Sequence, residues 1–247
     1  MPGSLLHNHS MPEDIDIFIL CGGFGTRLQG VVKDRPKPMI PINGKPFLEI
    51  IIDHFASFGF KRFILCAHYK LDVIRANFTN YRDLDIEISE ESRPLGTAGA
   101  IKNAESFIKS GSVMVVNGDS FCPIDPNSLI SCHKQKGGIA TVVITETDGR
   151  NDAGYVKLGE DDKIVSFSEK KDDGCKKYIN AGIYLFDRKF FDQIDANNKV
   201  SLENDIFPKL TGNGLYGQVV GHKMYDIGTP ERLEHFQQVY QNNGSLI

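Results

Sequence analysis

The sequence lacks two features that would tie it to a membrane or to nucleic acid. None of its apolar runs approaches the roughly 20 residues that a membrane span requires, and residues 15–21 are typical of the longest. Positive charge is not in excess either, because 28 Lys and Arg stand against 32 Asp and Glu, a formal net charge of −4. Non-specific binding to nucleic acid draws on such an excess. We therefore expect a soluble protein with no nucleic acid and no membrane partner.

Cysteine is sparse and has no paired spacing. The five cysteines are an odd number and contain no Cys-x-x-Cys motif: Cys21, Cys66, Cys122, Cys132 and Cys175. This pattern argues against a disulfide framework and against a zinc knuckle. We expect reduced thiols and a cytoplasmic location. Residues 1–10 lack the positive start and apolar middle of a signal peptide, and we interpret them as a tag or disordered leader.

The first half of the chain alternates strand-like and helix-like segments. With 247 residues, of which 40% are hydrophobic, the chain can bury a sizeable core. Apolar patterning predicts strands at 15–20, 62–67, 85–89, 113–116 and 139–145, and helices at 47–58, 72–78, 97–108 and 126–136. This alternation is typical of an α/β fold with a doubly wound, mainly parallel, Rossmann-like sheet.

After residue 145 the pattern changes to short strand-like stretches between polar turns, at 154–158, 164–168, 178–186 and 215–220. We expect this β-rich half to be more antiparallel, to pack on the first half and to bind the substrate. A last helix is predicted at 230–241, with Thr229 as its N-cap and Pro230 at its first position. No linker or repeat divides the chain, so residues 11–247 are predicted to form one domain.

A glycine-rich turn follows the first strand. Gly22, Gly23 and Gly25 let backbone N–H groups approach a phosphate or a base closely, and Thr26 and Arg27 add a hydroxyl and a fork of donors. The turn matches neither the dinucleotide fingerprint nor the P-loop. We predict an anion site here, and a plain structural turn is the alternative.

Three more charged residues suit phosphate chemistry. Lys37 lies between Pro36 and Pro38, which fix the backbone of a rigid loop. Asp119 follows an apolar strand, at the end where open α/β sheets bind ligands, and Asp226 lies at a second strand-to-helix turn. Two carboxylates with open positions suit Mg²⁺, which takes its remaining oxygens from water and phosphates. Each Asp taken singly is explained better as a turn or cap residue, and only together with the anion loop does the metal interpretation become as good.

Weaker candidates follow later segments. Gly96 and Thr97 begin a helix whose small residues permit close approach of a base or ribose, and a turn with an N-cap is the alternative. Glu169 and Lys170 after one strand, and Asn180 within another, offer polar groups suited to sugar hydroxyls and a sugar phosphate.

In this order the motifs resemble those of the sugar-1-phosphate nucleotidyltransferases, the NDP-sugar pyrophosphorylases. The signature comprises Gly22-Gly23-Phe24-Gly25-Thr26-Arg27-Leu28, Pro36-Lys37-Pro38-Met39, Asn117-Gly118-Asp119, Glu169-Lys170, Asn180-Ala181-Gly182 and Asp226-Ile227-Gly228-Thr229-Pro230. The match spans about residues 15–241. Each piece alone is weak, whereas the ordered set is specific. Cys21 departs from the Ala of many relatives but is also small.

The resemblance implies in-line attack of a sugar 1-phosphate on the α-phosphorus of a nucleoside triphosphate, with release of pyrophosphate. It assigns catalysis to Arg27, Lys37, Asp119 and Asp226, with Mg²⁺ held by the two aspartates. It places Leu20, Gly22, Gly23, Gly25, Thr26, Gly96 and Thr97 at the nucleotide, and Gly154, Glu169, Lys170 and Asn180 at the sugar phosphate. Such chemistry depends on positioning and charge neutralisation. A homodimer is left open.

Within the family, the compact length and the segments 20–23, 47–49 and 201–208 look most similar to the D-glycero-α-D-manno-heptose 1-phosphate guanylyltransferases. We therefore expect GTP and that heptose 1-phosphate, for cell-surface polysaccharide such as lipopolysaccharide or capsule. Mannose-1-phosphate guanylyltransferases are an alternative, as are uridylyl-, thymidylyl- and cytidylyltransferases for other sugars.

Two rivals come from other classes. A glycosyltransferase would need an Asp-x-Asp metal motif after a central strand, and Asp14 with Asp16, or Asp83 with Asp85, has the spacing but not the placement. A non-catalytic regulatory homologue that binds nucleotide-sugars is disfavoured, because all the charged catalytic residues of the family are present.

Overall fold

The computed structural model describes residues 15–23, 34–150, 152–168, 177–196 and 198–242. Nine strands form one sheet: β1 (Ile15–Leu20), β4 (Arg62–Ala67), β5 (Asp85–Glu90), β6 (Ser112–Asn117), β8 (Ala140–Glu146), β9 (Tyr155–Leu158), β10 (Ile164–Ser168), β11 (Tyr178–Asp187) and β12 (Leu215–Val220). Their order is β10-β9-β11-β6-β1-β4-β5, with β8 paired to β11 and β12. Small ladders pair β2 (Pro41–Ile42) with β3 (Lys45–Pro46), and β7 (Ser120–Phe121) with β13 (Tyr225–Asp226).

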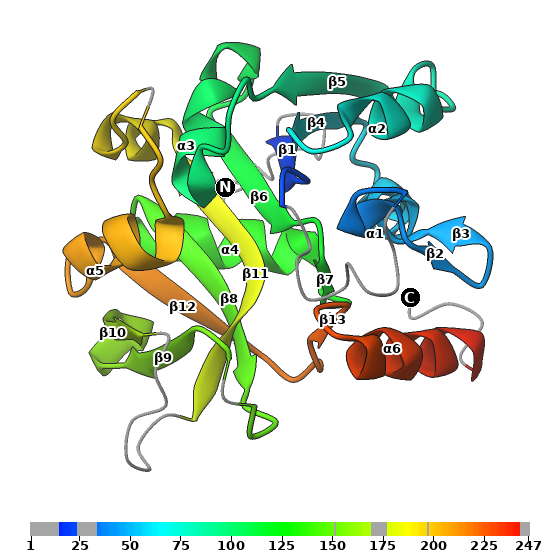
Figure 1. The fold of residues 1–247 in the computed structure, drawn as a ribbon. Helices are drawn as coiled ribbons and strands as arrows, with labels where there is room; N and C mark the ends of the chain where they lie inside the picture. The colour runs from blue at the N-terminus through cyan, green and yellow to red at the C-terminus, as the bar shows by residue number, and fades with distance from the viewer. Residues whose placement is uncertain (1–14, 24–33, 151, 169–176, 197, 243–247) are drawn as a thin grey trace, which may run out of the picture.

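Helices cover both faces of the sheet (Figure 1). They are α1 (Phe47–Ser57), α2 (Leu71–Phe78), α3 (Gly96–Asn103), α4 (Pro126–Lys136), α5 (Phe207–Leu210) and α6 (Pro230–Asn242), with short turns η3 (Lys37–Met39), η4 (Glu105–Phe107), η5 (Glu160–Asp162), η6 (Arg188–Gln193) and η7 (Leu202–Ile206). Side chains of β1 alternate between two cores: Ile17 and Ile19 pack with α1, and Phe18 packs with α3 and α5. This period of two is the one that a strand buried on both faces requires.

The doubly wound, mainly parallel α/β fold is confirmed, and so is a more antiparallel second half, in which β9 pairs antiparallel with β10, and β11 with β6, β8 and β9. One local expectation is wrong. Helix α3 ends at Asn103 rather than at residue 108, because the amide of Ala104 is shared between the carbonyls of Ala100 and Ile101, and the chain tightens into η4. Within the second half β12 is the exception, because it pairs with β8 in parallel. The long connection through η6, η7 and α5 carries the chain back across the sheet and makes this possible.

The sheet reverses its winding direction at β1, which pairs in parallel with β4 on one side and with β6 on the other. Loops leaving the carboxyl ends of β1 and β6 diverge, and such a crevice is where open α/β sheets bind ligands. The amide of Gly118 donates to the carbonyl of Leu20 at 3.0 Å, and a Cβ on Gly118 would lie 2.6 Å from that oxygen. Glycine at this position therefore lets the chain turn tightly and deliver Asp119 to the crevice.

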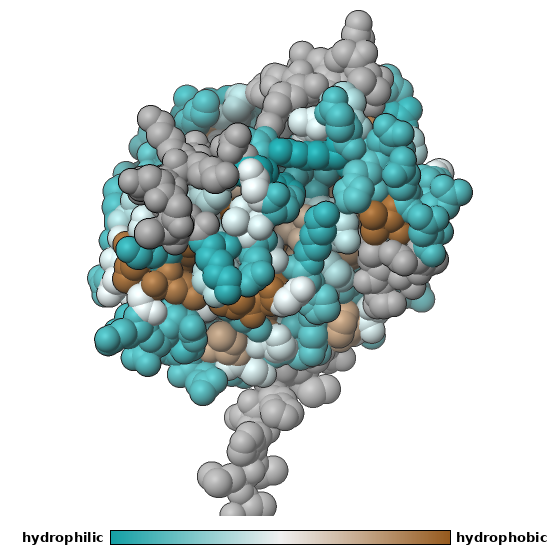
Figure 2. Space-filling view, turned by 90° about the horizontal axis from the view of Figure 1, so that it is seen from below, coloured by the Kyte–Doolittle hydropathy of each residue, from teal (hydrophilic) through white to brown (hydrophobic). Residues whose placement is uncertain are grey.

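The face of the molecule in Figure 2 is mainly hydrophilic, with hydrophobic residues in small separate groups. Among the described residues, the large hydrophobic side chains that are exposed are Val165 and Val219. No helix in the described part of the chain is long and apolar enough to cross a membrane.

Candidate active site

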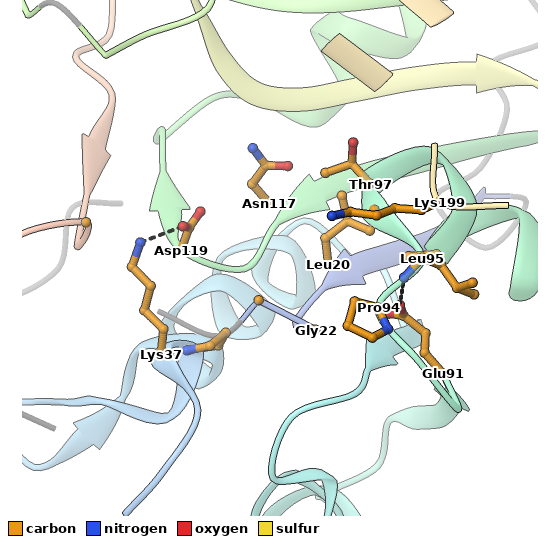
Figure 3. A pocket seen from close by; sticks show the side chains of 15 residues that line it. Leu20, Gly22, Lys37, Glu91, Pro94, Leu95, Thr97, Asn117, Asp119 and Lys199 are labelled. Atoms are coloured by element: carbon orange, nitrogen blue, oxygen red, sulfur yellow. Dashed lines mark hydrogen bonds and ion pairs between the residues drawn. The ribbon is translucent and has the colours of Figure 1, made fainter. Parts of the chain in front are cut away.

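A cavity of about 480 Å³ lies at the carboxyl ends of β1 and β6 (Figure 3). Its lining includes seven of the residues predicted to form the site: Leu20, Gly22, Gly23, Lys37, Gly96, Thr97 and Asp119. Eight lining residues were not among the predicted site residues: Pro38, Glu91, Pro94, Leu95, Ala100, Asn117, Lys199 and Gly228. Segments far apart in the chain thus meet in one cavity, as the family resemblance implied.

One end of the cavity holds a lysine and a carboxylate. Nζ of Lys37 lies 2.6 Å from Oδ2 of Asp119, and the lysine side chain is 11% exposed (Figure 3). Lys37 begins the short turn η3, in which Pro38 and Met39 are buried. Their burial fixes the loop, so the ammonium group is held beside Asp119 rather than free in solvent.

Asp226 lies next to Asp119 through the small β7–β13 ladder, in which the amide of Ile227 donates to the carbonyl of Asp119 at 3.0 Å. Its carboxylate accepts from Nη1 of Arg150, from Nη1 of Arg232 at 3.3 Å and from the amide of Gly228 at 2.8 Å. Asp226 faces a second cavity of about 310 Å³, beside the first.

Gly228 lines the first cavity and lies close to Asp226, which lines the second. A Cβ placed on Gly228 would lie 2.7 Å from Oδ1 of Asp226 and 3.7 Å from Nζ of Lys37. The aspartate and the lysine therefore flank the same small space, and only a glycine leaves that space open. The position of Gly228 in the Asp226-Ile227-Gly228 motif thus has a steric reason.

The two aspartates supply hard oxygen ligands of the kind that Mg²⁺ prefers. Within the described ranges, no group of three or more His, Cys, Asp or Glu side chains is gathered for a metal. Mg²⁺ commonly binds through one or two carboxylates and completes its shell with water and substrate phosphates. Asp119 and Asp226 therefore fit such an ion, and Lys37, Arg150 and Arg232 balance their charge in this structure.

The opposite end of the cavity contains a buried glutamate (Figure 3). Glu91 is 5% exposed, its Oε2 accepts from the amide of Leu95 at 3.1 Å, and its Oε1 lies 2.8 Å from where a Cβ of Gly22 would be. Burial raises the pKa of Glu91, an effect that the Leu95 amide and His68 partly oppose. No sequence motif marks this residue, and its burial becomes visible only in the fold, which brings the segment after β5 against Gly22.

A hydrogen-bond network leads from the predicted nucleotide side to the predicted sugar side. Oγ1 of Thr97 donates to Glu203 at 2.8 Å, the hydroxyl of Tyr184 donates to the same carboxylate at 3.3 Å, and the amide of Asn180 donates to Tyr184 at 2.7 Å. The backbone of Asn180 in turn donates to Gly154 at 2.8 Å. Gly154 and Asn180 are therefore adjacent, although neither lines the main cavity.

Asn117 presents a polar atom that the fold leaves unsatisfied. Its Oδ1 is buried without a hydrogen-bond partner in the described part of the chain, and the same holds for Oγ of nearby Ser120. A buried polar group without a partner costs about 1–3 kcal/mol. Because Asn117 lines the cavity, a ligand hydroxyl is a natural partner for its oxygen.

Five predicted site residues lie outside the described residues: Gly25, Thr26, Arg27, Glu169 and Lys170. The Asp-x-Asp pairs considered for a glycosyltransferase have structural roles where they are described. Oδ2 of buried Asp16 accepts from the amide of Lys109 at 2.7 Å, and its Oδ1 accepts from Arg62 at 2.9 Å. Arg62 also pairs with Asp85. These carboxylates tie strands together and are remote from the cavity.

The chain was compared with known proteins. The family described as "Nucleotidyl transferase" matches residues 17–243. A D-glycero-alpha-D-manno-heptose 1-phosphate guanylyltransferase of Campylobacter jejuni is 38% identical, over 88% of this chain and 96% of that protein. A mannose-1-phosphate guanylyltransferase of Mycobacterium tuberculosis is 35% identical over 89% of this chain, which spans only 62% of that longer relative.

The solved structures agree. The crystal structure of HddC from Yersinia pseudotuberculosis, complexed with GMP-PN, matches with a TM-score of 0.80 and 32% identity, over 91% of this chain and 99% of that one. The resemblance that the ordered motifs indicated is thereby confirmed. The chain belongs to the nucleotidyl transferase family.

Proposed function

We propose that this protein transfers a guanylyl group from GTP to a manno-configured sugar 1-phosphate, D-glycero-α-D-manno-heptose 1-phosphate first, and releases pyrophosphate. The observation that carries the proposal is the layout of the main cavity. A buried carboxylate, Glu91, lies at one end, and the Lys37–Asp119 pair lies at the other. The named activities of the relatives from Campylobacter jejuni and Mycobacterium tuberculosis support the same chemistry.

Glu91 favours guanine among the bases. Guanine presents two adjacent donors, N1–H and the N2 amino group, on one edge, and a carboxylate is an acceptor for both. Uracil and thymine offer one donor between two acceptors, and adenine offers an amino group beside an acceptor. A carboxylate buried in the pocket therefore pairs well with guanine and poorly with the other bases, whose acceptors would face it.

The phosphates would lie toward the other end. Lys37 would neutralise charge on the phosphates around the reacting centre, and we propose that Arg27 binds the triphosphate and its leaving pyrophosphate. Asp119 and Asp226 would hold Mg²⁺, which neutralises phosphate charge when it is bound. The work of the side chains is to align the attacking oxygen and to stabilise charge in the transition state.

The sugar would be bound from the β-rich half. We propose that Glu169, Asn180 and Gly154 face the sugar ring and that Lys170 binds its phosphate. Asn117 would accept a hydroxyl hydrogen with its unsatisfied Oδ1. Lys199 lines the cavity and has no ion pair with another described residue, so its charge is available to a phosphate.

The experiment is pyrophosphate release in Mg²⁺ over a grid of nucleoside triphosphates and sugar 1-phosphates, including manno-heptose, mannose, glucose and N-acetylated sugars. We expect GTP with the heptose phosphate to dominate, and GTP with mannose 1-phosphate is the runner-up. Dominance of UTP, dTTP or CTP would overturn the guanylyl assignment. If no pair of substrates releases pyrophosphate, in protein that still binds GTP, a regulatory homologue would be favoured.

A pair of variants tests the role of Glu91. Glu91→Gln should lower the ratio of kcat/KM for GTP to that for UTP by about 10- to 100-fold, because an amide presents a donor to the base where a carboxylate cannot. The matched control is Glu90→Gln, since Glu90 is its exposed neighbour and pairs with Arg75 at the surface. An unchanged ratio in Glu91→Gln would remove this residue from base recognition.

A further inference from the structure

The second cavity is built around an arginine held at two ends. Nε and Nη2 of Arg150 donate to the two carboxylate oxygens of Asp148, at 2.9 and 2.6 Å, and Nη1 donates to Oδ2 of Asp226. The Arg150 side chain is 11% exposed, and that of Asp226 is 14% exposed. A largely buried arginine is thus fixed by one carboxylate and directed at another.

Asp148 anchors the guanidinium permanently. The hydrogen bonds from Arg150 lower the pKa of Asp148 to about 2, so this carboxylate stays ionised throughout the neutral range. A bidentate arginine–carboxylate pair is geometrically specific. Nε and Nη2 of Arg150 therefore stay bound to Asp148, and Nη1 is the donor that can exchange its partner.

Asp226 is the carboxylate that we assign to Mg²⁺, so its pairing with Arg150 conflicts with that assignment unless the pair can open. The cluster holds four cations, Lys37, Arg150, Lys223 and Arg232, against four carboxylates: Asp119, Asp148, Asp152 and Asp226. Its charge is then zero, which gives a phosphate no net attraction. A divalent cation on Asp119 and Asp226 would make that charge positive and would leave Nη1 of Arg150 without its acceptor.

The chain also places Arg150 on the acceptor side of the site. It lies in the connection between β8 and β9, four residues before Gly154, which is adjacent to Asn180. The phosphate nearest to it would be the monoester phosphate of the acceptor sugar rather than the distal phosphates of the nucleotide, which we place toward Lys37 and Arg27.

We propose that Arg150 is a phosphate-binding residue whose resting partner is Asp226: when Asp226 takes a divalent cation, Nη1 of Arg150 passes to an oxygen of the acceptor phosphate. Lys37 and Asp119 form a second pair of the same kind, which opens in the same step. The resting ion pairs thus keep both cations in place and prevent phosphate from binding productively before the metal.

The test uses two probes that need no turnover, Mn²⁺ followed by its paramagnetic resonance signal and inorganic phosphate followed by equilibrium dialysis. Arg150→Met is compared with the wild type, and Arg75→Met is the matched control, because Arg75 lies on α2 and pairs with Glu90 at the surface. Arg150→Gln is the second variant, and a thermal melt reports folding.

Without phosphate, Arg150→Met should bind Mn²⁺ about tenfold more tightly than the wild type, because Asp226 then has only the longer contact with Arg232, at 3.3 Å, to release. In saturating Mn²⁺ the same variant should bind phosphate about tenfold more weakly, because the transferred donor is missing. Arg150→Gln should change both affinities in the same directions, and Arg75→Met should change neither.

Two results would overturn the proposal. Weaker or unchanged Mn²⁺ binding in both Arg150 variants would make Arg150 a support for Asp226 rather than its competitor. Unchanged phosphate affinity in saturating Mn²⁺ would remove Arg150 from phosphate binding. The proposal relies on the proposed function only for the identity of the acceptor, and these titrations can succeed even where the GTP and sugar grid fails.

Discussion

The two ends of the main cavity are built in different ways. The nucleotide end is made of backbone and small residues, Gly22, Gly23 and Gly96, with a single buried carboxylate, Glu91. The reaction end contains charged side chains in close contact, and Lys37 and Asp119 are its cavity-lining members. In the function we propose, one end would select the base by shape and by one hydrogen-bonding edge, and the other would act through a balance of charge that substrate and metal change.

This difference predicts that substitutions at the two ends of the cavity affect different properties of the protein. A change at the reaction end should affect turnover and leave folding and base selection almost unaltered, because its residues are partly exposed and paired with each other. A change at the nucleotide end should affect stability and binding together, because its residues pack tightly against other segments of backbone.

The largest effect is expected for Asp119→Asn at the reaction end. The substitution removes one predicted Mg²⁺ ligand and the ionic partner of Lys37, so kcat for pyrophosphate release should fall about 1,000-fold. The melting temperature and the Kd for GTP measured without metal should stay near the wild-type values. Near-normal turnover would remove Asp119 from the metal site.

Gly96→Ala should act at the nucleotide end through stability. Gly96 has a φ of +74°, and a Cβ there would lie 2.5 Å from the carbonyl oxygen of Val200. We expect the free energy of unfolding in urea to fall by about 2–4 kcal/mol, and GTP binding to weaken with it. Gly111→Ala is the control, because a Cβ there meets open space. Equal stability of the two variants would contradict this explanation of Gly96.

The smallest effect is a pH dependence of the free energy of unfolding, caused by a buried histidine that packs close to the reaction end. His54 is 2% exposed, its Nε2 lies 2.9 Å from the carbonyl of Ile124, and its ring packs edge-on against Phe121, which follows Asp119. Burial lowers the pKa of His54, so the folded state disfavours the proton that the unfolded chain accepts.

Stability should therefore fall by about 1 kcal/mol as the pH drops from 7.5 to 5.5, through the ordinary histidine pKa. His54→Gln should reduce this slope in urea titrations at the two pH values. The control is His235→Gln, at an exposed residue of α6. If the unfolding free energy of His54→Gln depends on pH as steeply as that of the wild type, the burial of His54 is not the cause.

The sequence indicated most of the fold, because hydrophobic periodicity is a local signal. It placed β1, β4 and α4 at the bounds that the structure has. It did not predict the parallel pairing of β12 with β8, which depends on a long connection, or the end of α3, which depends on one shared amide.

The same distinction between local and long-range signals separates the site residues that the sequence predicted from those that it did not. Residues in motifs, such as Lys37 and Asp119, were predicted because the motif is contiguous in the chain. Glu91 and Arg150 were not, because each acquires its role from a partner on another element, Gly22 for one and Asp226 for the other. Contacts of this kind leave no spacing that a single sequence can reveal.

The start of α3 has one further consequence. The amides of Ala98 and Gly99, at the positive end of the helix, both donate to the carbonyl of Val200. A backbone segment from a later part of the chain thus occupies the place where many nucleotide-binding folds hold a phosphate. This segment forms part of the cavity wall through Lys199, so we expect changes in its length or sequence to alter the shape of the cavity while Lys37 and Asp119 stay untouched. Exchange of this segment between relatives is therefore a route to new nucleotide preference with unchanged chemistry.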